Sequence, residues 1–202
     1  MTAFAEGTSV DNWDGTADIS WYTDHETDTE YRFTTAEQLA GMAKLINDDT
    51  AYFKDKTVYL DNDLDLGGHE WISIGDGANT DVGSFQGVFD GQSHVVYNLY
   101  SHEGLKSENK DNNNNLYRNG LFGSIYNATV KNLGIENADI VIPMNDTSTY
   151  GKGILVDWMT DSTINNCYTL HSPRYSAPDC RGTGLAPALH HLTVKDTNSA
   201  TS

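Results

Sequence analysis

Two runs of alternating apolar and polar residues lie between Thr57 and Leu99, separated by a glycine-rich corner. Successive side chains of a strand point to opposite faces, so a period of two residues indicates strands with one buried face. The first run has its apolar residues at even positions, which are Val58, Leu60, Leu64 and Leu66. The second has them around the turn Asp90-Gly91, at Val88, Phe89, Val95, Val96 and Leu99. Two such runs in close succession predict a mainly β fold, the stacked strands of a solenoid.

A pair of matching segments further along the chain also predicts stacking. One begins at Gly120 and the other at Gly153. Each starts with glycine and an apolar run, continues through a polar turn, and then has threonine, an apolar residue, a polar residue and asparagine before the next apolar residue. One such unit cannot bury its apolar face alone, so successive units are expected to lie over one another.

The N-terminal part is predicted to form a cap over this stack. Thr34-Thr35-Ala36-Glu37 has the pattern of a capping box, in which the Thr34 hydroxyl binds a backbone N–H and Glu37 reaches back. An apolar stripe with helical spacing follows, at Leu39, Met42, Ala43 and Ile46. A helix is therefore predicted at about 35–48, within an N-terminal cap that covers 11–53.

Changes in pattern predict the other boundaries. Strand periodicity continues over 54–172, interrupted at 101–119, where its absence predicts a long loop. Three of the four prolines follow residue 172, and 173–202 is expected to be an irregular or disordered tail. Residues 1–10 are interpreted as the remnant of a secretion leader, because Ala3-Phe4-Ala5 resembles a cleavage site.

The charge of the chain excludes several classes of partner. Acidic residues outnumber basic ones by 29 to 12, which gives a net charge of −17. Such an excess repels nucleic-acid phosphates and anionic lipids, so no nucleic acid is expected as a partner. No apolar run has the length of a membrane span, and no membrane insertion is expected. The two cysteines, Cys167 and Cys180, form one disulfide or stay free thiols.

An ordered series of aromatic and glycine motifs covers about residues 11–172. The series is Trp13-Asp-Gly, Trp21-Tyr22, Thr35-Ala-Glu-Gln-Leu39, Val58-x-Leu60, Asp63-Leu-Asp-Leu66, Trp71-Ile-x-Ile-Gly75, Phe85-x-Gly-x-Phe-Asp-Gly91, Asn98-Leu99 and Gly120-Leu-Phe-Gly123. In this order the motifs resemble the GLUG-motif proteins of bacterial surfaces. The structural positions are Trp71, Gly75, Phe85, Gly87, Phe89, Gly91, Gly120, Leu121, Phe122 and Gly123. A second copy at Gly153-Ile-Leu-Val156 departs from the pattern, because Asp157 replaces the usual glycine.

The resemblance implies a right-handed parallel β-helix with an N-terminal capping helix, in secreted or wall-attached bacterial proteins. In that family the motif occurs in multidomain adhesin-like proteins and in extensions of immunoglobulin A proteases, and no catalytic residues belong to the motif itself. The chain is accordingly expected to be a non-catalytic module of a larger multidomain protein. Its expected role is adhesion, display or binding of a host protein or glycan.

An acidic row provides the candidate binding residues. Asp61, Asp63 and Asp65 alternate with inward residues, so they are expected to line an outer face, with Asp90 on the neighbouring strand. No basic partner for them is evident in the pattern. Calcium at Asp63 and Asp65 is one interpretation, and a solvated or turn-bonded acidic edge is the other. An EF-hand is excluded because its central glycine and closing glutamate are missing. No other cofactor is indicated.

Two other functions stay open. Parallel β-helices host glycosidases and polysaccharide lyases, so one alternative is a carbohydrate-active enzyme with an acidic groove. A purely structural stalk is the other. Asn79-Thr80-Asp81 matches the first motif of polygalacturonases, but the remaining motifs of those enzymes are absent. Zinc-protease, serine-hydrolase and phosphate-loop patterns are absent as well, and no catalytic residue is assigned.

Overall fold

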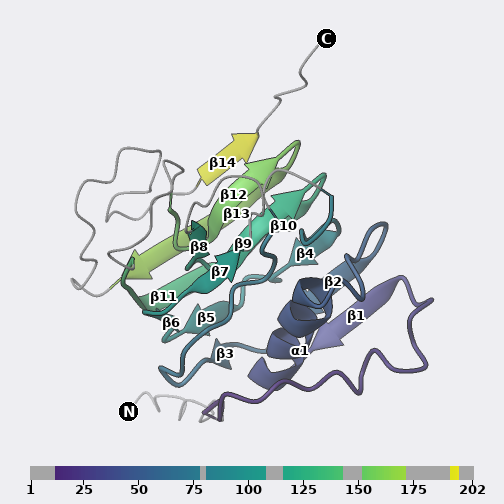
Figure 1. Ribbon diagram of the computed structural model, residues 1–202, viewed down its shortest axis with the longest axis horizontal. Coiled ribbons are helices and arrows are strands. Elements are labelled where there is room, and N and C mark those ends of the chain that lie inside the picture. Colours follow the sequence, from purple (N-terminus) through teal and green to yellow (C-terminus); the bar gives the residue numbers. More distant parts are fainter. Residues whose placement is uncertain (1–11, 78–80, 108–115, 143–151, 172–191, 196–202) are drawn as a thin grey trace, which may run out of the picture.

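The protein consists mainly of β-strands, most of them in one large parallel sheet, with one helix packed beside it among the described residues (Figure 1). The computed structural model describes residues 12–77, 81–107, 116–142, 152–171 and 192–195. The helix is α1 (Ala36–Asn47). The strands are β1 (Glu30–Phe33), β2 (Thr57–Leu60), β3 (Leu64–Asp65), β4 (Val88–Asp90), β5 (Val95–Tyr97), β6 (Tyr100–Ser101), β7 (Leu105–Ser107), β8 (Leu116–Arg118), β9 (Phe122–Tyr126), β10 (Thr129–Lys131), β11 (Gly134–Ile140), β12 (Val156–Thr160), β13 (Thr163–His171) and β14 (Leu192–Lys195). The prediction of a mainly β fold is confirmed.

Parallel strands from distant parts of the sequence lie side by side in three ladders. The first ladder contains β1, β2, β4, β10 and the first half of β13. Its successive partners are Tyr31, Val58, Phe89, Val130 and Ile164. Because each residue is paired with its equivalent in the next strand, the apolar positions form continuous columns across the sheet.

The other two ladders extend the same arrangement. The second contains β3, β5, β11 and the second half of β13, with Leu64, Val96, Ile135 and Thr169 as successive partners. The third pairs β9 with β12, and a bridge from Ile74 to Phe122 adds a further pass of the chain.

The chain visits the three ladders in a fixed order. From β2 it continues to β3 and Ile74, from β4 to β5 and β9, and from β10 to β11 and β12. Parallel neighbours cannot be joined by a tight hairpin and need a crossover connection. Here the strands of the other two ladders form part of that crossover.

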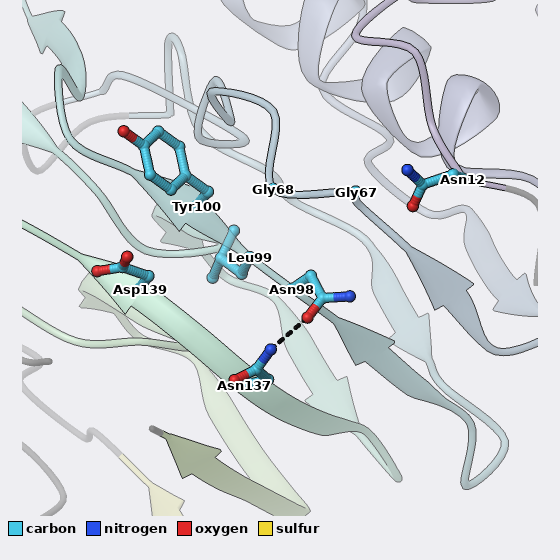
Figure 2. Close-up of a pocket in the computed structure, with 8 residues that line it drawn as sticks. All are labelled: Asn12, Gly67, Gly68, Asn98, Leu99, Tyr100, Asn137 and Asp139. Carbon is cyan, nitrogen blue, oxygen red and sulfur yellow. Dashed lines mark hydrogen bonds between the residues drawn. The ribbon is translucent and has the colours of Figure 1, made fainter. Parts of the chain in front are cut away.

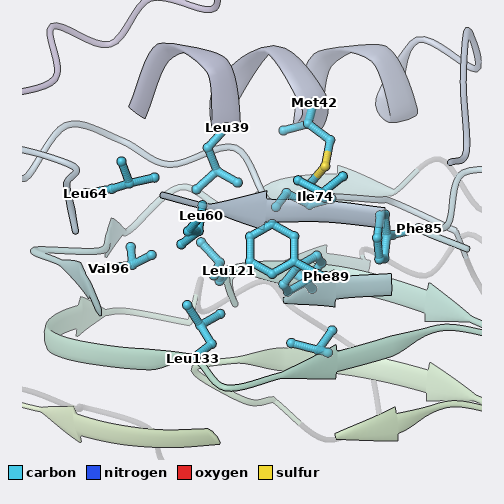
Figure 3. Packing of buried hydrophobic residues seen from close by; sticks show 14 of the residues in the cluster. Leu39, Met42, Leu60, Leu64, Ile74, Phe85, Phe89, Val96, Leu121 and Leu133 are labelled. Atoms are coloured by element: carbon cyan, nitrogen blue, oxygen red, sulfur yellow. The ribbon is translucent and has the colours of Figure 1, made fainter. Parts of the chain in front are cut away.

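Apolar side chains from the three ladders fill the space between them (Figure 3). Phe85 contacts Phe89 and Phe122, with ring centroids 6.4 and 5.6 Å apart. Trp71 is fully buried, and its indole Nε1 donates a hydrogen bond to the Leu121 carbonyl at 3.1 Å. The paired indole satisfies the one polar atom of this side chain, so Trp71 stabilises the core without an unpaired donor.

Helix α1 covers the N-terminal side of this core. Leu39, Met42 and Ile46 are fully buried, and Figure 3 shows the helix lying over Leu60, Ile74 and Phe85. The helix is too short and too polar to cross a membrane, and the described residues contain no other candidate.

The capping box that the sequence predicted at Thr34 and Glu37 is wrong by one residue. Thr35 is the N-cap, and its hydroxyl accepts a hydrogen bond from the Gln38 backbone N–H. The Gln38 side chain accepts in return from the N–H groups of Thr34 and Thr35, at 2.8 and 3.3 Å. Because the Gln38 side chain accepts from two backbone N–H groups at once, the capping box forms between Thr35 and Gln38 rather than between Thr34 and Glu37.

Two predicted irregular segments contain strands. The stretch 101–119, predicted to be a loop, holds the end of β6 and an antiparallel pair, β7 and β8. The tail 173–202, predicted to be irregular, holds β14, which pairs antiparallel with β13. Residues 1–10, interpreted as a leader remnant, lie outside the described residues.

Two motif glycines allow neighbouring passes of the chain to approach closely. A Cβ atom on Gly91 would lie 2.6 Å from the Asn132 carbonyl oxygen, and one on Gly123 would collide with the Gly75 carbonyl. These contacts are with backbone, which cannot move aside without breaking the ladder. Glycine at these positions is therefore required by the stacking itself.

We expect Gly123→Ala to lower the free energy of unfolding by about 3 kcal/mol, as overpacking in a rigid core does. The measurement is urea denaturation followed by circular dichroism. Gly68→Asn is the control, because Gly68 has a φ of +71°, which asparagine tolerates, and a Cβ at this position would have no neighbouring atom within 4 Å. Equal stability of the two variants would contradict the close approach described here.

Candidate functional site

The predicted acidic row lies on the outer surface, but its carboxylates already have protein partners. Asp61 accepts hydrogen bonds from Arg32 at 2.8 Å and from the Gln92 side chain at 2.7 Å. Asp63 accepts from the Val95 backbone N–H at 2.9 Å and lies 3.0 Å from Nδ1 of His94. The expectation that the row lacks basic partners is wrong, because the partners come from neighbouring strands that the sequence spacing does not reveal.

Asp65 begins a ladder of amide hydrogen bonds that climbs one corner of the stack. Its carboxylate accepts from the Gly67 N–H and from the Asn98 side chain, at 2.8 and 2.7 Å. The Asn137 amide donates in turn to Asn98 (Figure 2). Both asparagines have positive φ, at 56° and 58°, a conformation that asparagine tolerates better than most residues.

Asp90 begins an equivalent ladder at another corner. The Asn132 amide donates to Asp90 at 2.9 Å, and the Asn166 amide donates to Asn132 at 2.8 Å. Lys131 lies 3.2 Å from the same carboxylate. Gln92 joins the two acidic positions, because its backbone N–H donates to Asp90 and its side chain donates to Asp61.

The four predicted aspartates therefore do not converge on one site. Asp61 and Asp90 meet at Gln92, whereas Asp65 belongs to the other corner. Among the described residues no group of three or more His, Cys, Asp or Glu side chains has the arrangement of a metal site. Calcium at Asp63 and Asp65 stays a prediction.

A pocket lies beside the Asp65 ladder. Its volume is about 370 Å³. Figure 2 shows its lining, which is Asn12, Gly67, Gly68, Asn98, Leu99, Tyr100, Asn137 and Asp139. The lining combines two glycines, three amides, one leucine, one aromatic ring and one carboxylate. Such a mixture suits a small polar ligand that has both hydrogen-bonding groups and an apolar face.

A cluster of aromatic and charged groups fixes one wall of this pocket. The rings of Tyr100 and His102 are stacked, with centroids 4.0 Å apart and an interplanar angle of 27°. Nε2 of His102 lies 3.1 Å from the Asp139 carboxylate. The Glu70 carboxylate accepts from the backbone N–H groups of His102, Glu103 and Gly104 at 2.8–3.2 Å. These contacts hold Tyr100 in place before any ligand binds.

The outer face of the second ladder continues from the pocket with two more tyrosines. Tyr97 is the last residue of β5, directly before Asn98, and is paired with Glu136 on β11. Tyr168 on β13 lies over Gly134, where a Cβ would come within 2.5 Å of its ring, and its hydroxyl donates to Glu136 at 2.8 Å. Burial raises the pKa of Tyr168 to about 12, so its hydroxyl stays protonated at neutral pH.

The sequence contained a signal for the pocket that spacing alone did not single out. Two segments, Tyr97-Asn98-Leu99-Tyr100 and Glu136-Asn137-Ala138-Asp139, lie side by side in the sheet. Tyr97 is paired with Glu136, and Tyr100 is paired with Asp139. Each has asparagine second, at the same place in successive passes of the chain. Asn132 and Asn166 follow the same rule at the other corner, where their side chains are joined by a hydrogen bond.

Asp157 explains how the second motif copy departs from the first. Its side chain is buried, and its carboxylate accepts backbone N–H bonds from Asn119 at 2.6 Å, Gly120 at 3.2 Å and Gly153 at 2.9 Å. Burial raises the pKa of this carboxyl, an effect that Lys152 and the three N–H bonds oppose. The carboxylate links two passes of the chain at the place where the first copy has Gly123.

Comparison with known proteins identifies no relative. No family model, no curated protein and no solved structure matches the chain.

Asp90→Asn is expected to reduce the acid sensitivity of folding. Burial opposes ionisation of Asp90, but bonds from Asn132, Gln92 and Lys131 outweigh it and lower the pKa of the carboxyl. Because the pKa of Asp90 is lower in the folded state, its carboxylate stabilises the fold at pH values above the unfolded-state pKa. This stabilisation is lost as the pH falls through the folded-state pKa. Asparagine keeps the ladder acceptor but not the charge. The variant should cost up to about 1 kcal/mol at pH 7, and progressively less as the pH falls through the folded-state pKa of Asp90. The prediction would be contradicted if the unfolding free energies of the wild type and the variant differed by the same amount at every pH.

Replacing Asp157 with alanine should lower the free energy of unfolding by about 2–4 kcal/mol, because three buried N–H donors lose their acceptor. Thermal and urea unfolding measure the effect. Asp81→Ala is the matched control, since Asp81 is exposed. A loss no greater than that of the control would show that the three bonds contribute little.

Proposed function

We propose that the chain is a right-handed parallel β-helix of the GLUG-motif kind, and that it serves as a non-catalytic binding module of a secreted or surface-attached bacterial protein. The fixed order of the three parallel ladders and the match between the two glycine-led segments support the fold. The motif order over residues 11–172 supports the family. A host protein or a glycan is the proposed partner, and a larger multidomain chain is the proposed context.

One observation carries the binding role. A pocket of about 370 Å³ opens at a corner of the stack, while the aspartates that could supply chemistry are held by donors of the scaffold. Glycoside hydrolysis needs two carboxyl groups on opposite sides of the bond that breaks. The described lining of the pocket has one, Asp139. The geometry therefore favours binding over catalysis.

The purified protein should bind members of an array of glycans and extracellular proteins and leave them intact. Binding is measured by fluorescence, and cleavage by release of reducing ends. Degradation of a glycan that is abolished in Asp63→Asn or Asp90→Asn would favour the enzyme instead. Silence on the whole array would favour a purely structural stalk.

A further inference from the structure

We infer that the pocket beside Asn98 and Asn137 binds a neutral saccharide, with Tyr100 as the surface on which one sugar ring stacks. This inference rests on the proposed binding function and names its ligand class. The pocket volume of about 370 Å³ lies within the range of small-molecule sites.

The hydrogen-bonding groups of the pocket match the hydroxyl groups of a sugar. Three amides line the pocket, from Asn12, Asn98 and Asn137. An amide has two N–H donors and an oxygen with two lone pairs, so the one bond that Asn98 makes at each of these groups leaves capacity for a sugar hydroxyl. Asn98 and Asn137 are tied to each other, and Asn98 is tied to Asp65, so their orientation is fixed. A preorganised set of polar groups loses less entropy when a ligand binds.

The aromatic wall provides the apolar contact. Tyr100 is partly exposed and lines the pocket, while its ring is stacked with His102, whose Nε2 lies 3.1 Å from the Asp139 carboxylate. A ring that is already immobilised presents its surface to a ligand at little cost in conformational freedom. Sugar rings carry apolar C–H faces as well as hydroxyl groups, and this combination is what a tyrosine between amides accommodates.

Charge selects a neutral ligand over an anionic one. The described lining contains no lysine or arginine and includes the carboxylate of Asp139, in a chain of net charge −17. Uronates and sulfated or phosphorylated sugars would be repelled. The Asp139 carboxylate lies 3.1 Å from Nε2 of His102, and the nearby Asp65 carboxylate accepts two hydrogen bonds, so a cationic ligand would have to compete with these protein partners.

The adjoining face gives the saccharide room to extend. Tyr97 and Tyr168 lie on the outer side of β5 and β13, next to the corner that Asn98 and Asn137 form. Tyr168 lies over Gly134, where the missing side chain leaves space for its ring. A chain of two or more sugars that runs from Tyr100 past the two asparagines would meet these tyrosines.

The test is an array of neutral, uronate-containing and cationic oligosaccharides, probed with the wild type and three variants. Tyr100→Ala removes the stacking surface, and Gly68→Asn places an amide in the pocket at a φ of +71° that asparagine tolerates. Tyr59→Ala is the control, because it removes a tyrosine that does not line the pocket. Tyr59 lies on the first ladder, where the guanidinium carbon of Arg32 is 4.5 Å from the centroid of its ring. Thermal unfolding checks that every variant is folded.

We expect wild-type binding to neutral oligosaccharides that falls about tenfold or more in Tyr100→Ala and Gly68→Asn and is unchanged in Tyr59→Ala. Binding of uronate or cationic sugars alone, or neutral binding that folded pocket variants retain, would overturn the saccharide site and leave the binding function standing. Binding to proteins but to no sugar would do the same. No binding to any sugar or protein would overturn both.

Discussion

The structure depends on the register between parallel strands that belong to successive passes of the chain. When Val58, Phe89 and Val130 occupy equivalent places, every residue that follows them in the turns is also brought over its equivalent. Side chains at the corners then meet partners of the same position one pass away. The two amide ladders, the aromatic core and the close glycine contacts are all consequences of this one alignment.

The same alignment explains why the pocket and the scaffold share residues. Asp65 binds the Gly67 N–H and the Asn98 side chain at the corner, and both Gly67 and Asn98 line the pocket. A buried or half-buried polar group is costly unless it is paired. Pairing within the stack therefore also fixes the polar groups of the pocket, so a repetitive scaffold can carry a pocket of defined shape.

Much of the architecture could be predicted because it rests on local periodicity. The inward positions of Val58, Leu60, Leu64 and Leu66 follow from their two-residue spacing, and all four are buried. The capping box was displaced because threonine occurs twice in succession, and only the reach of Gln38 decides between the two. The partners of Asp61 and Asp90 could not be predicted, since Arg32, Asn132 and Lys131 come from other passes of the chain. The pocket was missed for the same reason: it is defined by the register between β5, β6 and β11.

The antiparallel pairing of β14 with β13 has a consequence for assembly. A parallel edge strand offers a row of N–H and C=O groups to any further strand, including one from a second copy of the chain. On β13 the partners Thr163, Ile164 and Cys167 are taken by Lys195, Val194 and Leu192, which run in the opposite direction. A strand of reversed polarity cannot begin another equivalent pass, so the described part of this ladder ends in an antiparallel pair, and any further strand would meet β14 rather than the edge of β13.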